Sequence, residues 1–412
     1  MAQPRVSVVI VSRDRPKALL HCLLGLDQLF YQNVEAIVVA DPKGATAVAG
    51  SGWADTVKLI EFDRPNISAA RNLGIKAAAG EIVAFIDDDA VPEPTWLDYL
   101  VEPFEHVDIA AAGGFVRGRN GITFQSQARM VNTLGNHASI EHSDDGIIYP
   151  TLKEGWAVKT EGTNCAFRRD VLCALGGFDP AFRFYLDETD LNLRLAKSGA
   201  KTALVPQAQV HHGFAASAQR HQSRVPRDLF EIGASQVVFL RKHAGPELHQ
   251  PALQNLVNDQ RKRLLRHMVN GTCEPRDVAR VMASLAEGID EGWQRPIGDM
   301  PKLHPANQPF QRFTPTRRFD GSTVIKGRIW SGRALRRKAS RQVKDGKRVS
   351  LFLFSPTTLF HRVRLHADGY WEQRGGIFGK SDRSQPIFQY ESFNSRVKKE
   401  IKRVQSFRKC GD

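Results

Sequence analysis

Cysteine is scarce in this sequence, and long apolar runs are missing. The five cysteines form neither a CxxC pair nor a Cys/His group with metal-ligand spacing, and their odd number argues against a full disulfide framework. This usage indicates a reducing compartment. The first apolar run, Val6 to Val11, is followed at once by polar residues, and no later segment reaches the length of a membrane span. We therefore expect a soluble or peripheral protein.

Length and charge set further limits. With 412 residues, 42% of them hydrophobic, the chain is long enough for two or three folded units. The net charge is +14, and most of the excess follows about residue 220. Such a basic tail favours anionic lipid, nucleic acid or a phosphorylated substrate, or only keeps a surface solvated. No recognised nucleic-acid-binding module is present, so we expect no specific nucleic-acid partner.

Strand-like and helix-like segments alternate through the first 210 residues. The apolar segments "VSVVIV", "VEAIVVAD", "VKLIEFD" and "EIVAFI" are typical of strands. A leucine-rich helix is predicted after Pro16, and a second helix is predicted to start at Asn66 or Ser68 and to stop at Gly80. The alternation predicts the α/β class, with a mostly parallel sheet flanked by helices on both faces.

Acidic residues follow the predicted strands, at Asp14, Asp41, Asp63 and the run Asp87 to Asp89. Ligands of open α/β sheets bind outside the carboxyl ends of the strands, which is where these side chains fall. Three adjacent carboxylates repel one another unless a positive charge lies among them. A predicted helix starting at Asp187 adds three acids in its first turn, where the helix dipole tolerates them.

Four segments in order carry a resemblance to a known family: "VSVVIVSRDRPKAL", "RPNISAARNLGIKAAAGEIVAFIDDDAVPEPTWL", "GTNCAFRRDVLCALGGFDPAFRFYLDETDLNLRL" and "VPQAQVHH". Over about residues 5 to 215 the chain resembles family 2 glycosyltransferases with the Rossmann-like GT-A fold. The resemblance implies transfer of a sugar from a nucleotide-activated donor to an acceptor hydroxyl, with inversion at the anomeric carbon.

The resemblance also implies a divalent cation, Mn²⁺ or Mg²⁺, because the leaving diphosphate gains negative charge that a metal stabilises. By the family's pattern Asp89 is the expected direct ligand, while Asp87 and Asp88 reach the ribose or the metal through water. His211 or His212 matches the position from which many relatives supply an imidazole, and His211 is favoured.

The general base is expected in "LDETDL", which is similar to the family's Glu-Asp-X-Asp signature with the first two acids inverted. By alignment Glu188 takes the position of the base. Asp187 is the alternative, and Asp190 is expected to fix the start of the helix.

The donor is expected to contact several segments that the family uses for this purpose. The loop after the first strand and the acidic end of the second strand are expected to bind the nucleotide, Arg71 a phosphate or the aspartates, and "EGTNCAF" the sugar. The residues so implied are Ser12, Arg13, Asp14, Asp41, Arg71, Gly162 and Asn164.

We expect three regions: a catalytic domain at 1–218, a helical accessory region at 219–300, and a basic region of unknown role at 301–412 that contains strands and turns. The expected function is that of a hexosyltransferase-like enzyme in surface polysaccharide or glycoconjugate synthesis, with a saccharide or lipid-linked acceptor. A cytoplasmic location, with the basic region on the inner face of the membrane, follows from the same analogy. An inactive sugar-nucleotide-binding relative and a nucleotidyltransferase are the alternatives.

Overall fold

A computed structural model describes residues 3–142, 146–213, 225–305 and 307–410. The catalytic unit is built on a nine-stranded sheet in which β3, β2, β1, β4, β11, β6, β12 and β5 are neighbours in that order and β7 pairs with β6. The strands are β1 (Val6–Ser12), β2 (Val34–Ala40), β3 (Val57–Glu61), β4 (Ile82–Asp87), β5 (Ala90–Pro92), β6 (Ile109–Arg117), β7 (Phe124–Ser126), β11 (Cys165–Arg168) and β12 (Lys201–His212).

Six of these strands run in one direction, and β5, β7 and β11 run against them. β2 is buried along its whole length, as expected for a strand covered by helices on both faces. The predicted mostly parallel sheet is therefore confirmed. Its helices are α1 (Pro16–Leu26), α2 (Pro42–Ala49), α3 (Ile67–Ala77), α4 (Trp96–Leu100), α5 (Arg169–Ala174) and α6 (Asp187–Lys197).

Helix α3 shows how sequence determines this packing. Asn66 caps the helix by accepting the N–H of Ala69 at 2.9 Å, whereas Ser68 donates to the carbonyl of Phe182. Gly74 lets the helix lie directly on β1, because a Cβ there would come within 2.4 Å of Val9. The close approach holds the start of α3, and with it Arg71, over the end of the sheet.

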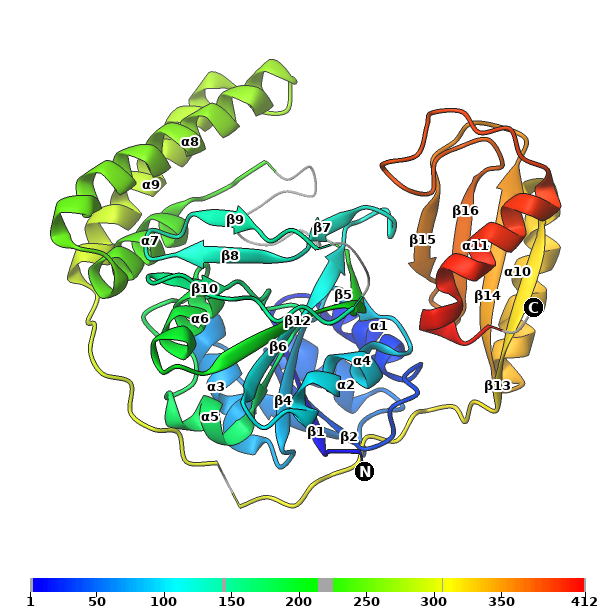
Figure 1. Cartoon of the computed structure of the whole chain (residues 1–412), viewed down its shortest axis with the longest axis horizontal. Coiled ribbons are helices and arrows are strands. Elements are labelled where there is room, and N and C mark those ends of the chain that lie inside the picture. The colour runs from blue at the N-terminus through cyan, green and yellow to red at the C-terminus, as the bar shows by residue number, and fades with distance from the viewer. Residues whose placement is uncertain (1–2, 143–145, 214–224, 306, 411–412) are drawn as a thin grey trace.

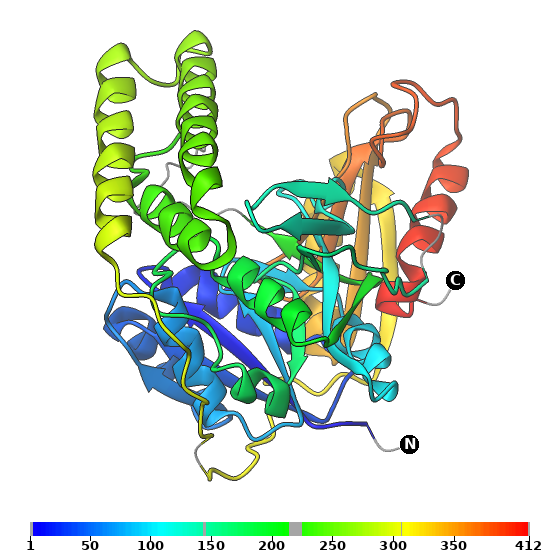
Figure 2. The same cartoon turned by 60° about the vertical axis from the view of Figure 1, so that its left-hand side comes forward.

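Two further groups of elements stand on the carboxyl side of this sheet (Figures 1 and 2). A small antiparallel sheet lies over it, and a helical group follows in the chain, with α8 and α9 forming an antiparallel hairpin that projects from the molecule. The elements are β8 (Arg129–Asn132), β9 (His137–Ser139), β10 (Trp156–Val158), α7 (Phe230–His243), α8 (His249–Val269) and α9 (Pro275–Gln294).

The C-terminal unit is a four-stranded sheet, ordered β13-β14-β16-β15, with one helix on each face. The basic region also contains a helix that was not predicted: the arginine- and lysine-rich stretch 327–348 mostly forms α10, whose Ala339 and Val343 pack on the sheet. The elements are β13 (Gly321–Arg328), α10 (Gly332–Lys344), β14 (Lys347–Ser355), β15 (Arg362–Leu365), β16 (Trp371–Gly376) and α11 (Phe393–Arg408).

An extended segment between α9 and β13 runs along the catalytic unit (Figure 1) and is fixed to it by hydrogen bonds such as Phe313 N–H to Val34 O at 2.8 Å. The boundary expected at residue 218 lies outside the described residues, and the three-region division stays a prediction. Within the described part of the chain, no helix is both long enough and apolar enough to cross a bilayer.

Candidate active site

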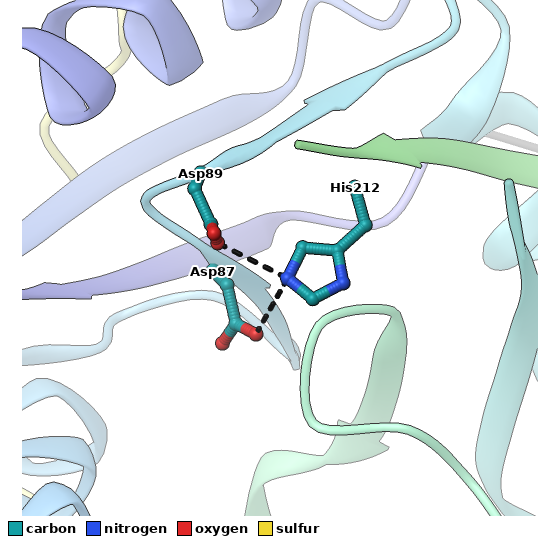
Figure 3. Close-up of side chains that lie close together, drawn as sticks. All are labelled: Asp87, Asp89 and His212. Carbon is teal, nitrogen blue, oxygen red and sulfur yellow. Dashed lines mark hydrogen bonds and ion pairs between the residues drawn. The ribbon is translucent and has the colours of Figure 1, made fainter. Parts of the chain in front are cut away.

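Two aspartates and a histidine meet where β4, β5 and β12 come together. β5 pairs with the last residues of β12 in a register that places His212 opposite Ala90, the residue after Asp89. His212 Nε2 lies 3.1 Å from Asp89 Oδ1 and 4.0 Å from Asp87 Oδ2 (Figure 3). One donor atom from each of the three residues lies within 4.8 Å of the other two. Two carboxylates and an imidazole at this spacing fit a divalent cation.

The neighbouring His211 faces the opposite side of β12, because side chains alternate along a strand. Its Nε2 lies 2.7 Å from Glu93 Oε1, and its ring packs on Trp371 at 4.8 Å between centroids. Burial lowers the pKa of His211, with the hydrogen bond to Glu93 acting in the opposite direction. The preference for His211 as a metal ligand is therefore corrected: the structure brings His212 to Asp87 and Asp89.

The middle aspartate of the run points away from this cluster. Asp88 is fully buried, accepts a hydrogen bond from Ser12 Oγ at 2.7 Å, and lies 2.7 Å from Arg15 Nη2. The same guanidinium lies 3.4 Å from Asp89 Oδ2. Burial raises the pKa of Asp88 to about 7, and Arg15 opposes that rise. Arg15 is thus the positive charge that three adjacent aspartates require, and Ser12 supports Asp88.

A cleft of about 830 Å³ opens beside the cluster. Its floor is formed by the ends of β1 and β4, and its walls come from the loop before α3 and from the segment before α6. The lining includes the cluster residues Asp87, Asp89 and His212. It also includes five cationic side chains: Arg13, Arg15, Arg64, Arg183 and Arg227. Ser12, Asp14, Phe62, Asn66 and Phe184 complete this part of the surface. Its size and its five arginines suit a ligand with negatively charged groups, beside carboxylates that include Glu231.

Three of the expected nucleotide contacts take different positions. Arg13 and Asp14 line the cleft and are paired with Asp63 at 3.2 Å and Lys43 at 3.0 Å. Asp41 instead caps α2 by accepting the N–H of Gly44 at 3.2 Å, and its side chain is buried. The structure therefore brings Arg13 and Asp14 to the cleft and leaves Asp41 in a helix-capping role.

Arg71 joins the aspartate–histidine cluster to the acidic helix α6. Its buried guanidinium lies 3.4 Å from Asp87 Oδ1, donates to the carbonyl of Gly162 at 3.2 Å, and forms an ion pair with Asp187. A Cβ at position 162 would lie 2.5 Å from Arg71 Nη2, so glycine is what allows this approach. In this arrangement Gly162 makes room for the guanidinium of Arg71.

The three acids of α6 have separate partners. Asp187 pairs with Arg71, and Glu188 pairs with Lys159, whose Nζ lies 2.5 Å from Glu188 Oε1. Asp190 is fully buried and satisfied by Arg194, Lys242 and His243, at 2.8 to 2.9 Å. Through Lys242 and His243 of α7, Asp190 holds α6 against α7.

The first two acids differ in protonation and access. Burial raises the pKa of Asp187. Burial acts in the same sense on Glu188, but the ammonium of Lys159 outweighs it and lowers the pKa of Glu188. The Glu188 side chain keeps 18% of its surface exposed against 4% for Asp187. Glu188 is therefore the more acidic and the more accessible member of the pair.

Asn164 does not reach the cleft. Its buried amide donates to the carbonyls of Phe115 and Ala208 at 2.9 and 2.8 Å, and its oxygen accepts from Trp96 Nε1 at 2.7 Å. These bonds use both donors of the amide and tie β6, β11 and β12 together. The expectation that Asn164 bonds a donor sugar does not fit this geometry.

Sequence reasoning did not identify Arg15 or Lys159. Arg15 stands one residue beyond the predicted nucleotide loop, so the need to neutralise three aspartates could have indicated it. Lys159 lies in a stretch with weak periodicity, and only the pairing of β10 with β8 places it under α6. No local signal in the sequence distinguishes it from other lysines.

The structure thus combines an α/β sheet, an Asp-Asp-His cluster at its edge, a cleft lined by arginines and an acidic helix start. The sequence of the same region identifies the family. Residues 4–228, more than half of the chain, match the family described as "Glycosyltransferase like family 2". The chain therefore belongs to this family, as the resemblance in its sequence predicts.

Individual relatives match over shorter stretches. The chain is 30% identical over 237 residues to the O-antigen biosynthesis protein RfbC of Myxococcus xanthus, which covers 54% of this chain and 18% of that protein. It is 30% identical over 130 residues to the glucosyl-dolichyl phosphate glucuronosyltransferase of Haloferax volcanii, covering 30% and 38% of the two chains. The chain thus spans well under half the length of these relatives.

Among solved structures, the mannosyltransferase PcManGT from Pyrobaculum calidifontis, in complex with GDP-Man and Mn²⁺, aligns over 72% of this chain and 89% of its own. The TM-score is 0.43 and the identity is 17%, which makes this a partial likeness.

Proposed function

We propose that the protein is a metal-dependent, inverting hexosyltransferase that moves a sugar from a nucleoside-diphosphate donor to an acceptor hydroxyl. The observation that carries the proposal is the cluster of Asp87, Asp89 and His212 at the edge of the cleft, where one cation can contact protein and ligand together. A cation held there would stabilise the negative charge of the leaving diphosphate.

The donor set suggests a preference between metals. Asp87 and Asp89 offer hard oxygen ligands, whereas His212 offers a nitrogen that suits Mn²⁺ better than Mg²⁺. Mn²⁺ is therefore the proposed cofactor, with Mg²⁺ as the weaker alternative.

The remaining roles follow from position. Arg13, Asp14 and the other side chains lining the cleft would hold the nucleotide, and Arg71 would keep Asp87 and Asp187 in place without touching the donor. Glu188 is the proposed general base because it is ionised and accessible, and it would take the proton of the acceptor hydroxyl. Asp187 is the alternative base.

The acceptor is proposed to be a saccharide or lipid-linked saccharide of surface polysaccharide or glycoconjugate synthesis at the inner face of the membrane. The names of the two relatives, one in O-antigen biosynthesis and one acting on a dolichyl-phosphate-linked sugar, support this class. An inactive sugar-nucleotide-binding relative and a nucleotidyltransferase are the competing functions.

Calorimetric titration with UDP-, GDP- and dTDP-sugars, with and without Mn²⁺, tests the proposal. We expect one donor to bind only with metal and to lose binding in Asp89→Ala. Release of the nucleoside diphosphate from the bound donor separates an enzyme from an inactive relative, and release of sugar 1-phosphate, with the nucleoside monophosphate transferred, would indicate a nucleotidyltransferase. NMR of the product's anomeric proton then tests inversion.

A further inference from the structure

Three loops meet at one end of the C-terminal sheet. β13, β14 and β16 run parallel and end there, and β15 begins there. The chain leaves this end in residues 329–331, 356–361 and 377–392, which form the free end of the unit in both views (Figures 1 and 2).

Large apolar side chains are concentrated on these loops. Of the fifteen large hydrophobic residues that are strongly exposed in the described part of the chain, six lie here. Their exposed fractions run from 55% to 89%. We call them the tip patch: Trp330, Leu359, Phe360, Ile387, Phe388 and Tyr390. Exposure of this kind costs solvation free energy, so its concentration at one end of one unit indicates an interaction surface.

Hydrogen bonds hold two of the loops together. Gly376 N–H donates to Leu359 O at 2.8 Å, and His361 N–H donates to Lys380 O at 2.9 Å. Gln389 N–H donates to Phe378 O at 3.1 Å, and the ring of Phe378 stacks on Phe388 at 5.4 Å. The apolar side chains are therefore presented by a connected backbone.

The charges around the tip patch are mostly positive. Residues 328–333, 356–362 and 377–392 carry two acids, Asp382 and Glu391, and Glu391 is already paired with Lys399 at 2.8 Å. The same residues carry five basic side chains: Arg328, Arg333, Arg362, Lys380 and Arg383. Aromatic and aliphatic side chains ringed by cations match the interface of an anionic bilayer, where rings enter the headgroup layer and cations meet phosphate.

A second projecting element lies on the same side of the molecule as the tip patch. The α8–α9 hairpin and the tip loops both extend to the same side of the molecule in Figures 1 and 2. The end of α8 carries the exposed Val269 and three exposed cations, Arg261, Lys262 and Arg266. β5, which directly follows Asp89, lies between the two projections in Figure 1.

We propose that the tip patch docks the protein onto an anionic lipid bilayer, with the α8–α9 hairpin as a second contact and the active-site cleft facing the membrane. The argument for docking depends only on the side chains of these loops. The purpose of docking, which is delivery of a lipid-linked acceptor to the cleft, rests on the proposed function. A bilayer accepts side chains from several loops without a matching shape, which suits a patch spread over loop ends better than a protein groove does.

Sedimentation with vesicles of phosphatidylcholine, with or without phosphatidylglycerol, tests this with the full chain and without donor or metal. We expect binding only to the anionic vesicles and weaker binding at high salt. The triple variant Phe360→Ser/Ile387→Ser/Tyr390→Ser leaves the stacked Phe388 in place and should need at least about tenfold more lipid. The matched control is Val107→Ser/Leu248→Ser/Ile297→Ser, which removes three exposed apolar side chains elsewhere and should bind like the parent chain.

Charge reversal gives a second readout. Arg362→Glu/Arg383→Glu should abolish the preference for anionic vesicles while the far-ultraviolet circular dichroism stays unchanged. Equal binding by the parent and the triple variant, or no binding to anionic vesicles, overturns the proposal. A parent chain that self-associates through the patch, with the triple variant monomeric and no lipid binding by either, assigns the surface to a second copy instead. Vesicle binding without sugar transfer would refute the proposed function and leave the docking intact.

Discussion

The guanidinium of Arg408 makes two hydrogen bonds to the carboxylate of Glu93, 315 positions away in the sequence, at 2.9 and 2.8 Å. His211 shares the same carboxylate, and Trp371 covers the guanidinium at 4.2 Å from its ring centroid. Both partners of the pair are almost fully buried. The last turn of α11 is thereby fixed to the segment that follows the aspartate cluster.

Arg408→Met should destabilise the protein by about 3–5 kcal/mol, because it leaves the Glu93 carboxylate buried without its cation. Urea denaturation measures the loss, and Arg408→Lys should recover part of it. The methionine variant should also bind Mn²⁺ more weakly, since Glu93 lies four residues from Asp89. Unchanged stability in Arg408→Met would mean that this pair does not hold the two units together.

Replacing the two adjacent histidines should have separate effects. His212→Ala removes an imidazole that lies with Asp87 and Asp89, and we expect Mn²⁺ affinity to fall at least about tenfold. His211→Ala removes a partner of Glu93 and should mainly lower the free energy of unfolding. Electron paramagnetic resonance of free Mn²⁺ during titration compares the two variants. A larger loss of affinity in His211→Ala would contradict the assignment.

The acids of α6 allow a comparison of the candidate bases. Glu188→Gln should lower kcat by about 10²–10⁴ with little change in donor affinity, because only proton removal from the acceptor is lost. Asp187→Asn leaves Arg71 without its charged partner and should weaken donor binding and stability together. Steady-state kinetics and donor titration of both variants separate these effects. If Asp187→Asn alone abolished kcat with donor affinity intact, Asp187 would be the base.

Acid should destabilise the C-terminal unit through Glu400. Burial would raise the pKa of this carboxyl, but Arg403 and His361 outweigh burial and lower it from 4.5 to about 2. Because the folded form binds a proton less readily than the unfolded form, the stabilisation is complete above about pH 4.5 and is lost as pH falls toward 2. The shift corresponds to about 3 kcal/mol. Urea denaturation across this range should show a flatter acid limb for Glu400→Gln than for the parent, and parallel limbs would refute the prediction.

The strands and helices around the cleft could be predicted because each one satisfies a local rule. β2 is apolar except for Glu35, α1 begins at Pro16, and Asn66 caps α3, so periodicity and capping identify them without tertiary information. The aspartate run could be located for the same reason, since it follows a strand that the sequence marks clearly.

The partners of these residues depended on long-range pairing. The choice between His211 and His212 is made by the register of β12 against β5, which lies about 120 residues earlier, and a shift of one residue would reverse it. The amide of Asn164 could bond a sugar or the backbone of neighbouring strands equally well. The local sequence therefore could not show which of these two roles it has. The many basic residues of α10 hid its helical pattern in the sequence, although Ala339 and Val343 lie four residues apart on one apolar face.

The pairing of Glu93 with Arg408 also sets an order of events during synthesis. A ribosome completes β4 and β5 more than three hundred residues before it reaches Arg408. Until then the nascent catalytic unit holds a carboxylate in a site made for an ion pair, so it must keep that region open or hydrated. Glu93 therefore gains its buried cation only after α11 has left the exit tunnel, so the segment that follows the aspartate cluster reaches its final packing late in synthesis.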